Sequence, residues 1–128
     1  MCSSGEQPHR NPEHKWYVPL EVYSSSVYPV HAKGRAYVLS QDAARKVLSV
    51  GPNVRFNSME DLYVTGFCRA MAGLRCVHIP QIPNRNEEIT DCDVALYIFN
   101  VHNVRLESMI RLWNISRNRT AQQLCSSM

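Results

Sequence analysis

The sequence predicts one α/β or α+β unit, in which short strands and helices follow one another along the chain. Runs of aromatic and β-branched residues bounded by proline, glycine and serine are typical of short strands. Between these runs, apolar residues recur at helical spacing, which indicates amphipathic helices. The chain has 128 residues, enough for one domain but not for two complete ones, and it contains no internal repeat.

The two ends of the chain predict tails on either side of a central domain. Residues 1–14 are polar, contain Pro8 and Pro12 and show no hydrophobic period, so we expect a disordered tail or a severed connection there. Residues 15–118 carry the strand and helix patterns and predict the domain itself. Residues 119–128 predict a frayed C-terminal tail.

The first half of the domain predicts short strands that lead into a helix. Residues 16–18 and 21–23 are aromatic and β-branched, as in short strands or extended loops. Residues 35–39 predict a further strand, and Ser40 can cap a helix over residues 41–50.

The clearest helix begins at Ser58, because residues 58–61 match the capping-box pattern. Apolar residues then recur at helical spacing as far as Gly73. They are Tyr63, Val64, Phe67, Cys68 and Met71.

The second half of the domain predicts two strands and a last helix. Residues 76–79 read as a short strand and residues 94–99 as a buried one. We expect the last helix over about residues 103–117, with one apolar stripe. The stripe consists of Leu106, Met109, Ile110 and Trp113.

Composition narrows the class of protein. Apolar residues make up 45% of the chain and charged residues 20%, as in soluble globular domains. The formal charge of +3 is spread without a block of like charges, so it gives no argument for a nucleic-acid partner. No apolar run is long enough to cross a bilayer, and the first residues lack a secretory signal.

The five cysteines form neither a dense disulfide framework nor a paired zinc motif, and one or two disulfides remain possible. Uneven gaps favour buried thiols or a disulfide over a zinc site for the zinc-compatible set Cys68, Cys76, His78 and Cys92. Asn114 and Asn118 each begin an N-x-S/T triplet, the acceptor for N-glycosylation in a lumenal or extracellular setting.

Two motifs carry a family resemblance. Residues 28–40 read Tyr-Pro-Val-His-Ala-Lys-Gly-Arg-Ala-Tyr-Val-Leu-Ser, and residues 60–66 read Glu-Asp-Leu-Tyr-Val-Thr-Gly. In order and spacing they resemble the C-terminal half of the beta-1,3-galactosyltransferase family, which includes related beta-1,3-N-acetylglucosaminyltransferases. The likeness extends from about Lys15 to Trp113, and Trp16 stands where the family has a tryptophan before Tyr-Pro.

The resemblance implies a hexosyltransferase of the Golgi membrane, lumenal side, that transfers galactose or N-acetylglucosamine from a UDP-sugar to a glycan acceptor with inversion. It implies a mixed-sheet fold of GT-A type, of which residues 15–118 would be a partial domain without the nucleotide-binding half. It also implies Mn²⁺, held by an upstream Asp-x-Asp motif. Residues 91–93 spell Asp-x-Asp but lie downstream, so we interpret them as a coincidence. His102 resembles a histidine that some relatives place near the metal, although a structural histidine is the alternative.

Inverting transfer needs a base that takes the proton of the acceptor hydroxyl. The resemblance implies that Asp61 is this base and that Glu60 is a supporting carboxylate. Spacing alone favours another role, because acidic residues are stabilised in a first helical turn and Asp61 would complete a capping box with Ser58.

The substrate-binding candidates also have structural alternatives. Gly34 allows the backbone to approach a sugar or phosphate closely, or simply forms a turn. The family's second glycine is Ala36 here, and we expect its methyl group to narrow the site or close it. Tyr28, Tyr37 and Trp16 offer flat faces of the kind that sugars pack on, or belong to the core.

We expect the isolated chain to be inactive, because the groups that stabilise the leaving diphosphate are upstream in the family. The alternative is a non-catalytic lumenal module that binds a glycan or pairs with a full-length transferase. A cytosolic α/β domain with accidental motif matches is a third reading, and it predicts reduced cysteines.

Overall fold

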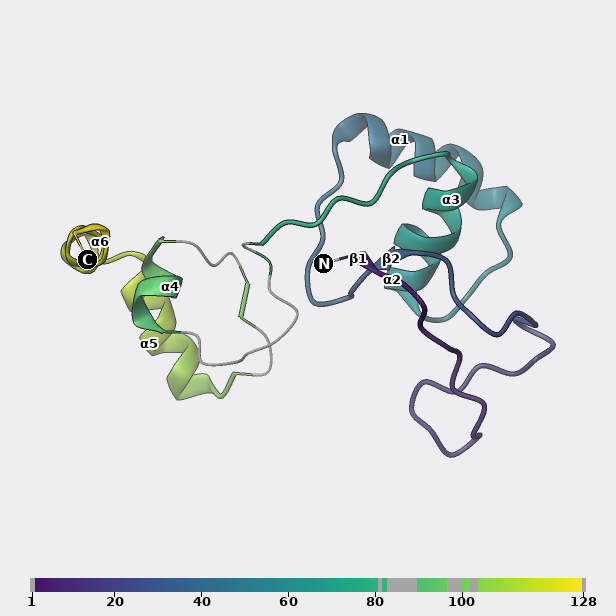
Figure 1. Cartoon of the computed structure of the whole chain (residues 1–128), viewed down its shortest axis with the longest axis horizontal. Helices are drawn as coiled ribbons and strands as arrows, with labels where there is room; N and C mark the ends of the chain where they lie inside the picture. The colour runs from purple at the N-terminus through teal and green to yellow at the C-terminus, as the bar shows by residue number, and fades with distance from the viewer. Residues whose placement is uncertain (1, 81, 83–89, 97–99, 102–103, 128) are drawn as a thin grey trace. The chain divides into compact units, whose positions relative to one another are not determined.

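The computed structural model describes residues 2–80, 82, 90–96, 100–101 and 104–127. These residues form two compact units, Met1–His78 and Ile79–Met128 (Figure 1). The first unit contains a two-stranded antiparallel sheet and helices, so the predicted mixture of strands and helices is present in a coarse form. The second contains helices α4, α5 and α6 among its described residues.

The first fourteen residues differ from the expected tail. Strand β1 (Cys2–Ser3) pairs with β2 (His31–Ala32), and Cys2 forms a disulfide with Cys76. The guanidinium of Arg10 donates hydrogen bonds to backbone carbonyls of the following loop. These acceptors are Val18 at 2.6 Å, Tyr23 at 2.7 Å and Ser25 at 3.0 Å. A disulfide and a multiply bonded guanidinium therefore fix a segment that lacks any hydrophobic period.

The predicted helix over residues 41–50 is confirmed as α1 (Gln41–Val50). The Ser40 side chain caps it and accepts the Ala43 N–H at 3.2 Å. A 3₁₀ turn, η1 (Gly51–Asn53), follows α1. The strand predicted over residues 35–39 is absent, because a strand needs a hydrogen-bonding neighbour and no described segment pairs with this one. The same reason applies to the strand predicted over residues 76–79.

The predicted central helix is confirmed as three consecutive helical segments. They are α2 (Glu60–Leu62), the π-helical η2 (Tyr63–Cys68) and α3 (Arg69–Met71). The capping box expected at Ser58 does not form. Met59 occupies the N-cap without a side-chain cap, and Asn57 Oδ1 instead accepts the Met59 N–H at 2.9 Å. The helix therefore starts directly at the acidic pair.

The core of the first unit joins this helix to the N-terminal loops. Val18, Tyr28 and Leu62 are buried together. Partly buried apolar side chains pack against them, namely Val22, Tyr23, Met59 and Phe67. The apolar face of the helix thus lies on the short aromatic runs that the sequence marks as extended.

The second unit corrects the prediction of a buried strand. Residues 94–96 belong to helix α4 (Asp91–Leu96), while residues 97–99 lie outside the described residues. Thr90 and Asp93 form a capping box, in which Asp93 Oδ2 accepts the Thr90 N–H at 2.9 Å and Thr90 Oγ1 accepts the Asp93 N–H at 3.2 Å. A short apolar run is ambiguous between strand and buried helix, and this cap decides for the helix.

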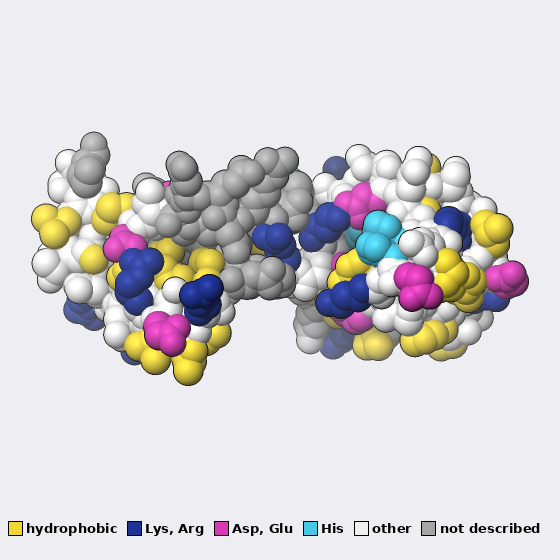
Figure 2. All heavy atoms as spheres, turned by 90° about the horizontal axis from the view of Figure 1, so that it is seen from below, with side chains coloured by type: hydrophobic (Ala, Val, Ile, Leu, Met, Phe, Trp, Pro, Cys, Tyr) yellow, Lys and Arg dark blue, Asp and Glu magenta, His cyan; other side chains and the backbone are white. Residues whose placement is uncertain are grey.

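Helix α5 (Leu106–Ser116) confirms most of the predicted last helix, and α6 (Arg119–Ser126) replaces the frayed tail. Cys92 on α4 and Cys125 on α6 form a disulfide, which fixes this C-terminal helix. The predicted apolar stripe lies at the surface, with Leu106, Met109, Ile110 and Trp113 exposed. In Figure 2, hydrophobic side chains of this unit lie at the surface among arginine and acidic side chains. Within the described residues, no helix has both the length and the apolar character needed to cross a bilayer.

Candidate active site

The acidic pair lies at the first two positions of the central helix. Glu60 is exposed and Asp61 is half-buried. Asp61 Oδ1 accepts the N–H of Leu62 at 2.9 Å, and this contact orients the carboxylate. The free N–H groups of the first turn favour negative charge at both positions.

Gly34 lies directly against Asp61. A Cβ atom placed on Gly34 would lie 2.9 Å from Asp61 Oδ2 and 3.1 Å from its Cγ. The two motifs therefore meet in space, and the missing side chain of Gly34 leaves the room that the carboxylate occupies. Gly34 also lies in a turn, as the alternative reading expects, but close approach to Asp61 is the reason that only glycine fits without a shift.

Tyr37 contacts the other carboxylate of the pair. Its hydroxyl donates a hydrogen bond to Glu60 Oε1. Burial raises the pKa of Tyr37 to about 12, together with the hydrogen bond to Glu60 and the nearby charges of Glu60 and Asp61. Near neutral pH, Tyr37 is therefore a neutral donor that faces a carboxylate.

Two buried residues of the π-helical segment hold the motifs together. Thr65 Oγ1 accepts the Ala32 N–H at 2.8 Å and donates to the Asp61 carbonyl oxygen at 2.5 Å. A Cβ on Gly66 would lie 3.1 Å from a Leu62 methyl carbon and 3.3 Å from the Cβ of His31. The final glycine of the second motif thus allows the first motif to pack closely on the helix.

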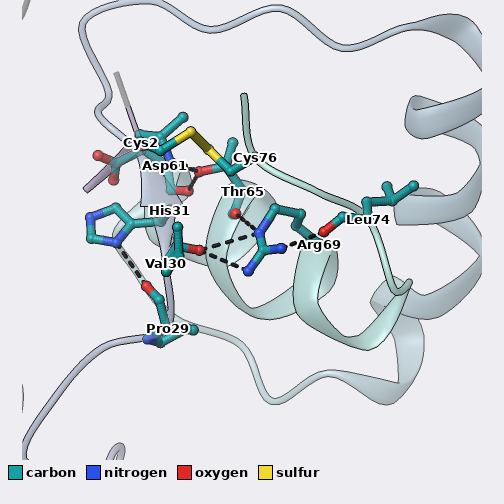
Figure 3. Close-up of a disulfide and its surroundings, with 10 residues drawn as sticks. Cys2, Pro29, Val30, His31, Asp61, Thr65, Arg69, Leu74 and Cys76 are labelled. Carbon is teal, nitrogen blue, oxygen red and sulfur yellow. Dashed lines mark hydrogen bonds between the residues drawn. A yellow bond between two sulfur atoms is a disulfide. The ribbon is translucent and has the colours of Figure 1, made fainter. Parts of the chain in front are cut away.

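Arg69 extends this connection by one more turn. Its guanidinium donates to the Val30 carbonyl at 3.0 Å and, through Nε, to the Thr65 carbonyl at 2.9 Å. It also donates to the Leu74 carbonyl. In Figure 3, Asp61, Thr65 and Arg69 lie along the helix beside the segment of Val30 and the Cys2–Cys76 disulfide.

A polar cluster lies next to β2. The buried His31 places Nε2 3.3 Å from Glu6 Oε2, and Nδ1 lies 3.0 Å from the Pro29 carbonyl oxygen. Glu6 also accepts hydrogen bonds from Lys33 and Ser3. Burial raises the pKa of Glu6, but these hydrogen bonds and the positive charges outweigh it, so the pKa lies below its usual value.

Comparison with known proteins identifies the family. A sequence model described as galactosyltransferase matches residues 1–80, which closely follow the unit Met1–His78. The chain belongs to the galactosyltransferase family. This result confirms the resemblance carried by the two motifs, and it excludes the reading of accidental matches.

Similar relatives are beta-1,3-galactosyltransferases. The chain is 34% identical to beta-1,3-galactosyltransferase 2 of Homo sapiens over 118 residues, which cover 86% of this chain and 26% of that relative. It is 31% identical to beta-1,3-galactosyltransferase 1 of Mus musculus over 109 residues, which cover 84% of this chain and 32% of that relative. The chain therefore spans about a quarter to a third of the length of these relatives.

The aromatic candidates of this galactosyltransferase-family chain lie in different surroundings. Tyr28 is only 8% exposed and packs in the core with Val18 and Leu62, so its ring is not open to a sugar. Trp16 is 48% exposed, with the Lys15 ammonium 4.6 Å from the ring centroid. The structure thus brings Gly34 and Tyr37 to the acidic pair, whereas Tyr28 serves packing.

A metal centre has no complete donor set in the part of the chain that the structure describes. That part contains no group of three His, Cys, Asp or Glu residues placed to hold an ion. Asp91 pairs with Arg111, and Asp93 caps α4, so both carboxylates of the downstream Asp-x-Asp sequence have structural partners. His102 lies outside the described residues.

The zinc-compatible set is not assembled, because Cys76 and Cys92 belong to different disulfides and Cys68 is a buried thiol. Asn114 and Asn118 are both exposed. Asn118 is the N-cap of α6, where its Oδ1 accepts the N–H groups of Thr120 at 2.9 Å and Ala121 at 3.2 Å. Capping uses the oxygen and leaves the amide nitrogen, the atom that N-glycosylation modifies, outside these bonds.

Four residues of the site were missed by sequence reasoning, namely Glu6, Thr65, Gly66 and Arg69. Thr65 and Gly66 stand inside the quoted motif, so their position was a usable signal. Arg69 follows Thr65 at helical spacing, and this spacing was a weaker signal. Glu6 lies in a segment without a pattern, and only the fold brings it to His31.

Proposed function

We propose that this chain is the acceptor-side part of a beta-1,3-hexosyltransferase. The reaction moves galactose or N-acetylglucosamine from a UDP-sugar to a glycan hydroxyl with inversion at the anomeric carbon. The observation that carries the proposal is the contact of the half-buried Asp61 carboxylate with Gly34 at the meeting point of the two family motifs. The proposal includes the GT-A type of fold for the whole enzyme.

Asp61 is the proposed general base. The acceptor oxygen attacks the anomeric carbon, the bond from that carbon to the diphosphate oxygen breaks, and UDP leaves with the bonding electrons. The acceptor proton passes to Asp61. The Leu62 N–H already holds Oδ1, so Oδ2, the oxygen beside Gly34, is the one assigned to the incoming hydroxyl.

We include a requirement for a divalent metal, Mn²⁺ in particular, in the proposal only because the chain belongs to this family. The described residues do not assemble a donor set for such an ion. We therefore derive no step through a metal, and the role of His102 as a ligand remains part of the proposal.

The proposed location is the lumenal side of the Golgi membrane. Two disulfides, Cys2–Cys76 and Cys92–Cys125, support an oxidising compartment. The exposed Asn114 and Asn118 are the proposed glycosylation sites. Reduced cysteines and unmodified asparagines in cells would contradict this location.

A second candidate function is a non-catalytic lumenal module that binds a glycan or pairs with a full-length transferase. Ala36 favours it, because the resemblance implies a glycine at this position and we expect the added methyl group to narrow the site. Under both candidates, the 128-residue chain alone transfers no sugar.

The test replaces the aligned segment of human beta-1,3-galactosyltransferase 2 with this chain and measures hexose transfer from UDP-galactose and UDP-N-acetylglucosamine. We expect transfer by this chimera and a loss of at least about 100-fold with Asp61→Asn, the range of general-base catalysis. Asp42→Asn is the matched control, because Asp42 is an exposed carboxylate on α1 that pairs with Lys46.

An inactive chimera that still binds glycan would favour the second candidate. Activity that survives Asp61→Asn would refute the assignment of the base.

A further inference from the structure

Two neighbouring carboxylates, Glu60 and Asp61, lie at the start of one helix, and either could take the proton of the acceptor. Glu60 and Asp61 differ in their contacts with the segment that follows β2. At one end of that segment, Gly34 lies against Asp61, whose carboxylate occupies the place of a side chain. Three residues further on, the Tyr37 hydroxyl donates to Glu60.

We propose that Tyr37 is a positioning residue, whose hydroxyl holds the Glu60 carboxylate and thereby leaves Asp61 as the carboxylate that meets the acceptor. This inference rests on the proposed function. It gives Tyr37 a role different from stacking on a sugar, because the contact that the structure shows is made by the hydroxyl and not by the ring face.

The protonation of the pair supports this role. Burial, the hydrogen bond to Glu60 and the charge of the pair raise the pKa of Tyr37 to about 12. The phenol therefore keeps its proton over the whole range in which a carboxylate base works, and it donates to Glu60 throughout that range. A carboxylate that accepts a fixed donor has less freedom to move toward its neighbour.

The spacing of the first motif gives the same result. Gly34 and Tyr37 are three residues apart in a segment of irregular backbone, yet each meets one member of an adjacent acidic pair. Ala32 anchors this segment to the helix through Thr65 Oγ1 at 2.8 Å. The segment is therefore held close enough to contact the two carboxylates differently: a hydroxyl donates to Glu60, whereas a residue without a side chain lies against Asp61.

The first experiment follows the ¹³Cζ resonances of tyrosine in the full 128-residue chain between pH 8 and 11, with the resonance of Tyr37 assigned by its loss in Tyr37→Phe. In the unmodified chain, we expect about one tenth of Tyr37 to be deprotonated at pH 11. Glu60→Gln should raise this fraction several-fold, and Asp61→Asn should raise it less, since Glu60 contributes more than Asp61. Methyl resonances of the buried Leu62 report that the chain stays folded.

Glu21→Gln is the matched control, because it removes an exposed carboxylate that does not contribute to the pKa of Tyr37. An unchanged Tyr37 titration in Glu60→Gln would overturn the pairing, whatever the activity of the protein.

The second experiment measures the chimera with human beta-1,3-galactosyltransferase 2. Tyr37→Phe keeps the ring and removes the hydroxyl, and we expect kcat to fall on the order of tenfold with KM for the acceptor within about twofold. Glu60→Ala removes the acceptor of this hydrogen bond and should cause a similar loss. The double variant should show no further loss, because each change removes one partner of the same contact.

A raised KM with unchanged kcat would overturn the inference, because the Tyr37 hydroxyl would then bind the acceptor instead of holding Glu60. Unchanged kinetics would overturn it as well. If the unmodified chimera transfers no sugar, the proposed function is refuted, and the role of Tyr37 in that reaction is refuted with it.

Discussion

The contact between Gly34 and Asp61 gives the most specific prediction. Gly34→Ala adds a Cβ atom 2.9 Å from Asp61 Oδ2, whereas ordinary contact begins at 3.4 Å. The carboxylate must therefore retreat by about 0.5 Å. Since a misplacement of about 1 Å can cost about 100-fold in rate, we expect a loss on the order of tenfold in kcat.

The same substitution should change stability little. Of the five glycines, all of which the structure describes, only Gly5 and Gly73 have a positive φ, so alanine fits the backbone at Gly34. Alanine also reduces the entropy of the unfolded chain, which contributes about 0.4–1 kcal/mol of stability. This gain offsets part of the cost of moving a half-buried carboxylate. We expect the free energy of unfolding to change by less than about 1 kcal/mol.

Two other glycines supply controls of opposite kinds. A Cβ on Gly51 would meet only the Tyr63 hydroxyl at 3.7 Å, so Gly51→Ala should raise stability by about 0.4–1 kcal/mol and leave transfer unchanged. A Cβ on Gly66 would press on two less flexible groups, at 3.1 Å from Leu62 and 3.3 Å from His31, and would make an ordinary contact with Pro29 at 3.4 Å. Gly66→Ala should therefore destabilise the chain by about 1–3 kcal/mol.

The assays are urea unfolding of the 128-residue chain and transfer by the chimera, each with all three variants. Unchanged kcat in Gly34→Ala would refute the reasoning, because the substitution would then have displaced a carboxylate that the reaction does not use. A loss of stability as large as that of Gly66→Ala would refute the assumption that Asp61 is the group that yields.

Two further predictions concern stability. Replacing both Cys2 and Cys76 with serine opens a loop with a sequence separation of 74. Chain entropy predicts that the free energy of unfolding, measured in urea, falls by about 4 kcal/mol. An unchanged midpoint would show that this disulfide does not hold the first unit together. Because the pKa of Glu6 is lowered from 4.5 in the folded state, its contribution is present above pH 4.5 and is lost as the pH falls through the folded value. Glu6→Gln should flatten the pH dependence of the unfolding free energy below pH 4.5, whereas the exposed Glu13→Gln should not, and equal slopes in both variants would contradict the role of Glu6.

The helices were the most predictable elements, because their signals are local. Ser40 and the apolar spacing identify α1, and the central helix follows from the recurrence of apolar residues after Met59. The signal for helix α4 was equally local, since Thr90 and Asp93 have capping-box spacing. The apolar run that follows Asp93 was nevertheless interpreted as a strand. The strands failed for a physical reason, because they depend on a partner that local patterns do not identify.

The candidate site was predictable in its motifs and not in its contacts. Gly34 and Asp61 are 27 residues apart in the sequence, and their contact depends on Thr65 and Gly66, which bring the two segments together. The expected capping box failed because the helix begins one residue later, with Met59 and not Ser58 as its N-cap. Tyr28 was ambiguous between a sugar platform and the core, since an aromatic side chain suits both, and only burial separates these roles.

The most direct test of the central claim, that Asp61 takes the proton of the acceptor, measures acceptor affinity and transfer rate on the same Asp61→Asn chimera. The account predicts an acceptor affinity within about twofold of the unmodified chimera and a rate at least about 100-fold lower, because the lost interaction acts in the transition state. An unchanged rate would contradict it, and so would a loss of affinity that accounts for the whole loss of rate.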